Sequence, residues 1–153
     1  MRMTTRAITE AVAAKIKENI PEAEVYMGSI EEKAKRPAFL YLPIYSDEKK
    51  VSLHTSRKTL ELQIIFFGRT DGAGKEDFMQ RMEVLDRIDG FLQSFELEVL
   101  DRILHFESET KDADGQMAIY LRFQFLDEAE GTAAEKSETA EHVAVNLFVN
   151  RKE

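Results

Sequence analysis

The sequence predicts an α+β fold: a mainly antiparallel sheet of about four to six strands, with two main helices packed on one face. Two stretches rich in β-branched and aromatic residues, Thr59–Phe67 and Gln116–Leu126, alternate side chains as strands do. Two other stretches, residues 4–19 and 76–95, repeat apolar residues at the spacing of amphipathic helices. Asp114-Gly115 is a hairpin turn signal, which indicates antiparallel pairing.

Length and composition favour one domain and exclude several classes of site. The 153 residues suit a single domain over 1–153. The absence of cysteine excludes disulfides, thiolate nucleophiles and cysteine-based zinc sites. The net charge of −8 disfavours specific nucleic-acid binding, because an acidic protein repels phosphate backbones. No apolar run approaches the roughly 20 residues of a membrane span, so we expect no membrane contact and a soluble, intracellular protein.

The N-terminal third is expected to supply one helix and two strands. The helix runs from Thr4 to Asn19, and its apolar stripe recurs four residues apart: Ile8, Val12, Ile16 and Ile20. A short strand over Ala23–Met27 and a polar loop lead to a second strand over Pro37–Tyr45. Because Pro43 has no N–H to donate, this strand should lie at a sheet edge or contain a bulge there. We expect Ser46–Lys50 to form a turn.

The central strand, Thr59–Phe67, is followed by a glycine-rich loop and the longest helix. The loop ends in Gly74-Lys75, but the spacing from Gly68 is one residue too long for a phosphate-binding loop, and Glu76 stands where that motif needs a hydroxyl. We therefore expect a connector. The helix over Glu76–Phe95 should bury one stripe and allow close packing at Gly90. The stripe consists of Phe78, Met82, Leu85, Ile88, Leu92 and Phe95.

The last third is expected to form a hairpin, a linker and a final strand. Arg102–Thr110 and Gln116–Leu126 are the two arms of the hairpin. Residues 127–141 are polar, without apolar periodicity, and are typical of a mobile linker. Alternating apolar residues then indicate a strand over 142–150. That strand can return as a hairpin partner of Gln116–Leu126, or it can add to the sheet edge of a neighbouring subunit.

No catalytic signature is present. The three histidines lie far apart and none is spaced as a metal ligand, so we expect neither a metal nor a cofactor. Glu107 and Glu109 would lie about 7 Å apart on one strand face, a spacing that could serve acid–base chemistry but more commonly marks a solvated face. Arg57, Lys58 and Arg69 bracket the central strand and could grip an anion, although charged residues at strand ends usually only solvate them.

The order of elements resembles a known family. Three segments carry the resemblance: Arg36-Pro37-Ala-Phe-Leu, then Arg57-Lys58-Thr-Leu-Glu-Leu-Gln-Ile-Ile-Phe-Phe67, then Met117-Ala-Ile-Tyr-Leu-Arg-Phe. Over residues 4–150 the chain looks like the small tail-terminator, or tail-completion, proteins of phages and of prophages in Gram-positive bacteria. The resemblance implies a compact α+β domain that assembles into a ring, commonly six-fold. Such a ring closes the growing tail tube and faces the head connector.

The leading hypothesis is therefore a structural, non-enzymatic tail assembly protein. It would form a homo-oligomeric ring at the head-proximal end of the tail, with tail-tube and head-connector proteins as partners. It would occupy the host bacterial cytoplasm during assembly and then the virion tail. The alternatives are a monomeric α+β module that binds a small molecule or peptide between the long helix and the sheet, and a hydrolase using two glutamates. Candidate subunit-interface residues are Arg57, Arg69, Val145, Leu147 and Phe148, and candidate residues of a lumen or acidic face are Glu107 and Glu109.

Overall fold

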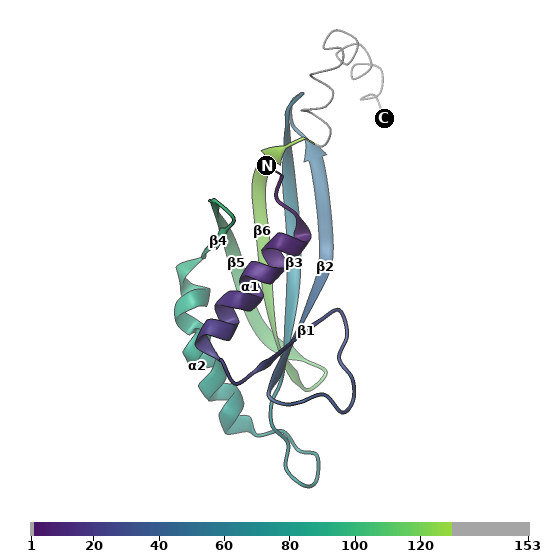
Figure 1. The fold of residues 1–153 in the computed structure, drawn as a ribbon, viewed down its shortest axis with the longest axis vertical. Coiled ribbons are helices and arrows are strands. Elements are labelled where there is room, and N and C mark those ends of the chain that lie inside the picture. Colours follow the sequence, from purple (N-terminus) through teal and green to yellow (C-terminus); the bar gives the residue numbers. More distant parts are fainter. Residues whose placement is uncertain (1, 130–153) are drawn as a thin grey trace.

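The computed structural model describes residues 2–129, which form two helices and one six-stranded sheet (Figure 1). Across the sheet the strand order is β1-β2-β3-β6-β5-β4. Every neighbouring pair is antiparallel except β1 and β2, which are parallel. These findings confirm the predicted α+β class and its mainly antiparallel sheet. The elements in chain order are α1 (Thr5–Asn19), β1 (Glu24–Met27), β2 (Ala38–Lys50), β3 (Thr55–Phe67), α2 (Phe78–Ser94), β4 (Glu96–Val99), β5 (Arg102–Ala113) and β6 (Gln116–Glu128).

The core lies between one face of the sheet and the two helices. The inward side chains of β3 and β6 face the same way, because the register places each beside its partner. They are Leu60, Leu62, Ile64 and Phe66 from β3, and Met117, Ile119, Leu121 and Phe123 from β6. Both helices add residues to this one cluster, so both pack on one face, as predicted. Full burial of each such side chain contributes about 1.5–3 kcal/mol to the free energy that favours folding.

Helix α1 follows the sequence prediction closely. Thr4 caps its start, since the hydroxyl accepts a hydrogen bond from the Ala7 N–H at 3.0 Å. All four residues of the predicted stripe are buried: Ile8, Val12, Ile16 and Ile20. The helix ends before Pro21, which cannot continue it.

Strand β2 is longer than predicted, and the turn expected at Ser46–Lys50 is wrong. These residues pair in register with β3 as far as Lys50 opposite Ser56, and the chain reverses over residues 51–54. Their charged composition indicated a turn, but the segment pairs with β3, and one opposite-charge pair, Glu48 and Lys58, lies across the strands, beside the like-charge pair Lys49 and Arg57. The irregularity expected at Pro43 is confirmed, because the register shifts between Pro43 and Tyr45.

Helix α2 is confirmed as an element, but the predicted buried stripe is wrong at both ends. The buried residues are Val84, Ile88, Phe91 and Leu92, and the predicted core residues Phe78, Met82 and Phe95 are exposed. The first turn of α2 is held by polar contacts instead. Arg81 contacts the Glu76 carboxylate at 2.6 Å and the Gly115 carbonyl at 2.7 Å. Close packing at Gly90 is also wrong, since a Cβ there would meet nothing within 4 Å.

The β4 strand was not predicted. It is only four residues long and follows α2 through Phe95, whose left-handed backbone ends the helix. The β5–β6 hairpin is confirmed, with positive φ at Asp114 and Gly115.

The predicted linker over 127–141 begins too early, because Asp127 and Glu128 belong to β6 and Asp127 is buried. The strand predicted over 142–150 lies outside the described residues. Within the described residues, β6 pairs with β3 on one side and with β5 on the other over residues 117–123.

Candidate functional site

The helix-free face of the sheet holds the two predicted glutamates. Glu107 and Glu109 are exposed on β5 and lie opposite Arg122 and Tyr120 of β6. Arg122 forms an ion pair with Glu61 of β3, and Lys111 lies 4.9 Å from the ring centre of Tyr120. Glu107 and Glu109 therefore belong to a solvated face of mixed charge, without the apolar surroundings that typify a catalytic carboxyl group. Such a face is suited to ion pairs and hydrogen bonds with another surface.

The two predicted arginines do not form one site. Arg57 is exposed on the helix-free face near the start of β3, and Arg69 is exposed in the loop after its end. Arg57 and Arg69 are twelve residues apart, and at the rise of an extended strand this separation is roughly 40 Å. The other predicted interface residues, Val145, Leu147 and Phe148, lie outside the described part of the chain.

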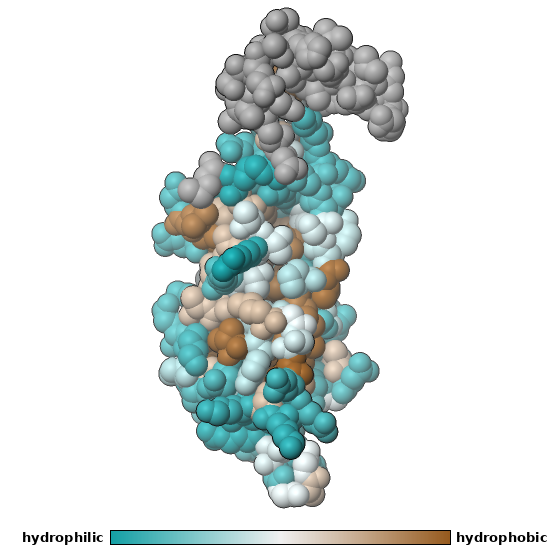
Figure 2. All heavy atoms as spheres, turned by 45° about the vertical axis from the view of Figure 1, so that its right-hand side comes forward, coloured by the Kyte–Doolittle hydropathy of each residue, from teal (hydrophilic) through white to brown (hydrophobic). Residues whose placement is uncertain are grey.

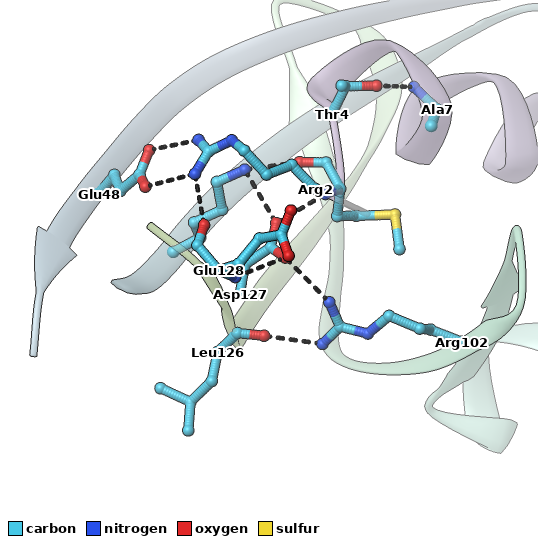
Figure 3. Close-up of polar contacts among 10 residues, drawn as sticks. Arg2, Thr4, Ala7, Glu48, Arg102, Leu126, Asp127 and Glu128 are labelled. Atoms are coloured by element: carbon cyan, nitrogen blue, oxygen red, sulfur yellow. Dashed lines mark hydrogen bonds and ion pairs between the residues drawn. The ribbon is translucent and has the colours of Figure 1, made fainter. Parts of the chain in front are cut away.

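A buried carboxylate ties together the segments that meet where β6 ends (Figure 3). The side chain of Asp127 is 2% exposed. Its oxygens accept hydrogen bonds from the Met3 N–H at 2.6 Å, Lys58 Nζ at 3.2 Å and an Arg102 Nη at 3.4 Å. The N-terminal segment, β3, β5 and β6 thus share one anchor, which we call the Asp127 cluster.

Neighbouring contacts complete the Asp127 cluster. Lys58 Nζ also donates to the Met3 carbonyl at 2.6 Å, and Arg102 donates to the Leu126 carbonyl at 2.8 Å. Arg2 forms an ion pair with Glu48 of β2 (Figure 3). Sequence reasoning missed this site because Asp127 stands at the start of a polar, acidic stretch.

Opposing effects set the pKa of Asp127. Burial pushes the pKa upward, but hydrogen bonds from the Met3 and Glu128 N–H groups and the charge of Lys58 outweigh it. The pKa therefore lies below its ordinary value, and Asp127 is ionised at neutral pH. Nearby, the Arg2 guanidinium lowers the pKa of Glu48 in the same direction.

Large apolar side chains are exposed in separate groups, a feature that sequence reasoning also missed. At the β1–β2 edge, Val25, Met27, Ile44 and Tyr45 are exposed, but on two faces of the sheet, since Met27 lies opposite the inward Tyr41 and Tyr45 opposite the outward Glu61. Around β4, Phe95, Leu100 and Ile103 are exposed, although the Phe95 ring also lies 6.5 Å from the buried Phe106 ring. A third opens α2 and consists of Phe78, Met79 and Met82. Figure 2 brings the β1–β2 side forward and shows apolar side chains over the middle of the molecule, between hydrophilic ends.

Hollows open on both sides of α1. One of about 540 Å³ lies between the start of α1 and the β1–β2 edge, where Met27, Tyr41 and Pro43 give it an apolar lining. The Tyr41 hydroxyl beside it is buried without a partner among the described residues, and burial raises the pKa of Tyr41. The other, of about 480 Å³, lies between α1, α2 and β4 and has charged walls, including Lys15, Glu18 and Glu96.

The glycine-rich loop satisfies its own backbone amides. The Gly68 N–H donates to the Glu76 carboxylate at 3.0 Å, and the Arg69 N–H donates to Gln80 at 2.7 Å. Asp71 accepts from the Ala73 and Lys75 N–H groups, both at 2.9 Å. Because these donors already have acceptors, and two of the acceptors are carboxylates, the geometry agrees with a connector rather than a phosphate site.

Two negative findings concern residues 2–129 only. In this part of the chain no group of three or more His, Asp or Glu side chains is placed to hold a metal ion. Neither helix there is long and apolar enough to cross a membrane.

Comparison with known proteins identifies a family. The family model described as phage tail terminator protein matches residues 7–135. The match therefore covers most of the chain and nearly all of the described fold, from α1 to the end of β6. No curated protein matches the sequence.

Proposed function

The chain belongs to the phage tail terminator family, and we propose that it acts as a ring that closes the tail tube at its head-proximal end. The observation that carries this proposal is the family match over residues 7–135, which spans the entire sheet, all of α2 and all but the first two residues of α1. Tail terminators are structural components of the virion tail, so the proposed activity is assembly rather than catalysis.

The two ends of the sheet support ring formation. Beyond Tyr41, β2 has no strand on its outer side in residues 2–129, and β4 forms the opposite edge. A ring of identical subunits needs two different surfaces on each copy, one for each neighbour. Open edges at opposite ends of one sheet are suitable places for such contacts.

The proposed ring gives roles to the residues predicted from sequence. Glu107 and Glu109 would face the lumen, where negative charge keeps the DNA backbone from binding as it passes. Their exposure on the helix-free face supports this role. Arg57 and Arg69, at the two ends of β3, would contact different neighbours or tail proteins. The segment containing Val145, Leu147 and Phe148 would reach an adjacent subunit.

The partners follow from the place of the ring. One side would meet the last layer of tail-tube subunits and the other the head connector, in a phage or a prophage of a Gram-positive host. Assembly would take place in the bacterial cytoplasm. The exposed start of α2 offers apolar area for one of these axial contacts, because exposed groups of Phe and Met side chains are typical of interaction surfaces.

The first test is the assembly state. Native mass spectrometry and light scattering of the purified chain at tens of micromolar, alone and with its tail-tube protein, should show a closed oligomer. Added to elongating tubes, the chain should stop their growth and leave shorter tubes than an equal concentration of an unrelated acidic protein. A strict monomer in both settings, with no effect on tube length, contradicts the proposal.

A further inference from the structure

Within residues 2–129, one side of β2 is only partly covered. β1 pairs with β2 over residues 38–41 and then turns away at Gly28, which has φ 81°. The pair ends with a hydrogen bond from the Gly28 N–H to the Tyr41 carbonyl, at 3.1 Å. Over residues 43–50, β2 pairs with β3 on one side and with no described strand on the other. We call this open stretch of backbone the β2 slot.

Apolar surface borders the β2 slot on both faces of the sheet. On the helix face, Met27, Tyr41 and Pro43 line the hollow of about 540 Å³ together with residues of α1. On the helix-free face, Tyr45 is 48% exposed opposite Glu61. An added strand covers both faces at once, because its side chains alternate between them. The buried Tyr41 hydroxyl, which has no partner among the described residues, also marks this hollow as incomplete.

The chain itself carries a segment with the pattern that the β2 slot needs. Residues 142–150, which lie outside the described part of the chain, form the predicted final strand and are about as many as the slot. The apolar residues of this segment alternate between two faces: Val143, Val145, Leu147 and Val149 on one, Ala144 and Phe148 on the other. The place first considered for this strand, beside β6, is filled by β3 and β5 over residues 117–123. The segment therefore needs an open edge.

Other open edges of the described sheet suit the segment less well. β4 is only four residues long. β5 pairs with β6 alone over residues 107–112, and all six of these residues are polar. The β2 slot is longer than β4 and, unlike this part of β5, has apolar surface beside it.

Charge neither selects nor opposes the segment at the β2 slot. Residues 43–50 contain two acidic and two basic side chains, and residues 142–150 contain no Asp, Glu, Lys or Arg. Pro43, the irregularity beside it and the two lysines are features that keep unsuited strands from a sheet edge. Specificity therefore comes from the backbone pattern and the apolar side chains.

The described chain ends close to the β2 slot. The Ala129 N–H donates to the His54 carbonyl at 3.0 Å, in the turn that joins β2 to β3. Strands β2 and β6 run in the same direction and end on this side of the sheet (Figure 1). From there, residues 130–141 span up to about 40 Å when extended. This length allows the final segment to reach an adjacent copy.

We propose that residues 142–150 of one copy add as a strand to the β2 slot of the next copy. The inference rests on the proposed ring, and it names the contact that links the subunits. Main-chain hydrogen bonds to β2 supply affinity, and apolar side chains fill the hollow beside Met27 and Tyr41. Because the segment and the slot are different surfaces, the contact repeats around a ring. The slot of the same chain is also within reach, so the experiment separates the two cases.

Cysteine cross-linking tests the contact directly, because the chain has no cysteine of its own. Two full-length variants, Tyr45→Cys in the β2 slot and Leu147→Cys in the segment, are mixed with the tail-tube protein and treated with a short bis-maleimide. We expect a covalent heterodimer of the two variants, identified by mass spectrometry of the linked peptides. Met79→Cys, exposed on α2, replaces Tyr45→Cys in the matched control and should give no adduct with Leu147→Cys.

A second measurement tests whether the contact drives assembly. Leu147→Lys should raise the concentration needed for half-assembly about tenfold, because a charge cannot enter the apolar hollow. The melting temperature of the unassembled chain should not change. Ala133→Lys places the same charge in the predicted linker and should assemble like the wild type.

The outcomes separate this contact from the ring itself. Rings that form without the heterodimer adduct overturn the inference and leave the ring intact. A chain with both cysteines that assembles but links only within itself also overturns it, because each segment then fills its own slot. Equal weakening by Ala133→Lys has the same consequence. Failure of the wild-type chain to assemble under any condition would count against the proposed function and, with it, this contact.

Discussion

Replacing Asp127 with asparagine removes the charge from the Asp127 cluster at nearly constant volume. The carboxylate is 2% exposed and faces two cations, Lys58 and Arg102. Removing one partner of a buried ion pair costs about 3–5 kcal/mol. Lys58 and Arg102 are partly exposed and each keeps a carbonyl acceptor, so we expect a smaller cost than this range, about 2–3 kcal/mol. For a domain of this size that is a fall of roughly 4–12 °C in melting temperature.

The pH dependence tests the electrostatic cause. Because the folded pKa of Asp127 is lowered, its stabilisation is complete above the unfolded value of about 3.9 and is lost as pH falls through the folded pKa. Urea unfolding at pH 7, 5, 4 and 3 should therefore show a gap between wild type and Asp127→Asn that is constant down to about pH 5 and then narrows. Asp86→Asn, on the exposed face of α2, is the control and should change stability by less than about 0.5 kcal/mol. A gap that stays the same from pH 7 to pH 3 would refute the electrostatic explanation.

Three further predictions test the fold. Leu62→Ala, at a fully buried position in the middle of β3, should lower the free energy of unfolding in urea by about 3 kcal/mol. Leu126→Ala, at an exposed position, should lower it by less than about 1 kcal/mol, and equal losses would contradict the assignment of the two sheet faces. Thr4→Ala should cost about 1 kcal/mol in the same assay by removing the cap of α1, and Thr4→Ser should recover most of that loss. Gly115→Ala, at φ 85° with open space around a Cβ, should cost about 1–2 kcal/mol from the backbone alone; no change in the unfolding midpoint would mean that the β5–β6 turn does not hold this conformation.

The elements that sequence predicted well are those whose periodicity reports burial directly. Alternation in Thr59–Phe67 identified β3 and the buried face of that strand, because one side of the sheet is covered by helices and the other is not. The four-residue repeat of α1 was equally clear, since Ile8, Val12 and Ile16 all face the sheet. The hairpin turn at Asp114-Gly115 is a local property of the backbone and needs no knowledge of distant residues.

The errors arose where distant contacts override local composition. Ser46–Lys50 has the composition of a turn, yet it is a strand because β3 pairs along it and Arg2 contacts Glu48 from the N-terminus. Asp127 was assigned to a polar linker, although its main partners are Met3, Lys58 and Arg102. The nearest of these partners is 25 residues away and the farthest 124, so no local window of sequence contains the reason for its burial.

Apolarity alone cannot separate a core residue from an interface residue, and α2 shows why. Phe78, Met82 and Phe95 fit the helical stripe as well as Ile88 does. A protein core and a protein interface both bury apolar side chains away from water, so the same residue types suit both. Backbone conformation supplies the missing distinction. A core residue is favoured by its own fold, whereas Leu100 is 54% exposed and stands at φ 58°, where the fold would favour another residue. If the compensating energy lies in a contact outside the monomer, then Leu100→Asn should stabilise the monomer and weaken the assembly. Opposite signs from one substitution cannot come from packing within the monomer alone, so this pair of measurements is the decisive test of where this side chain acts.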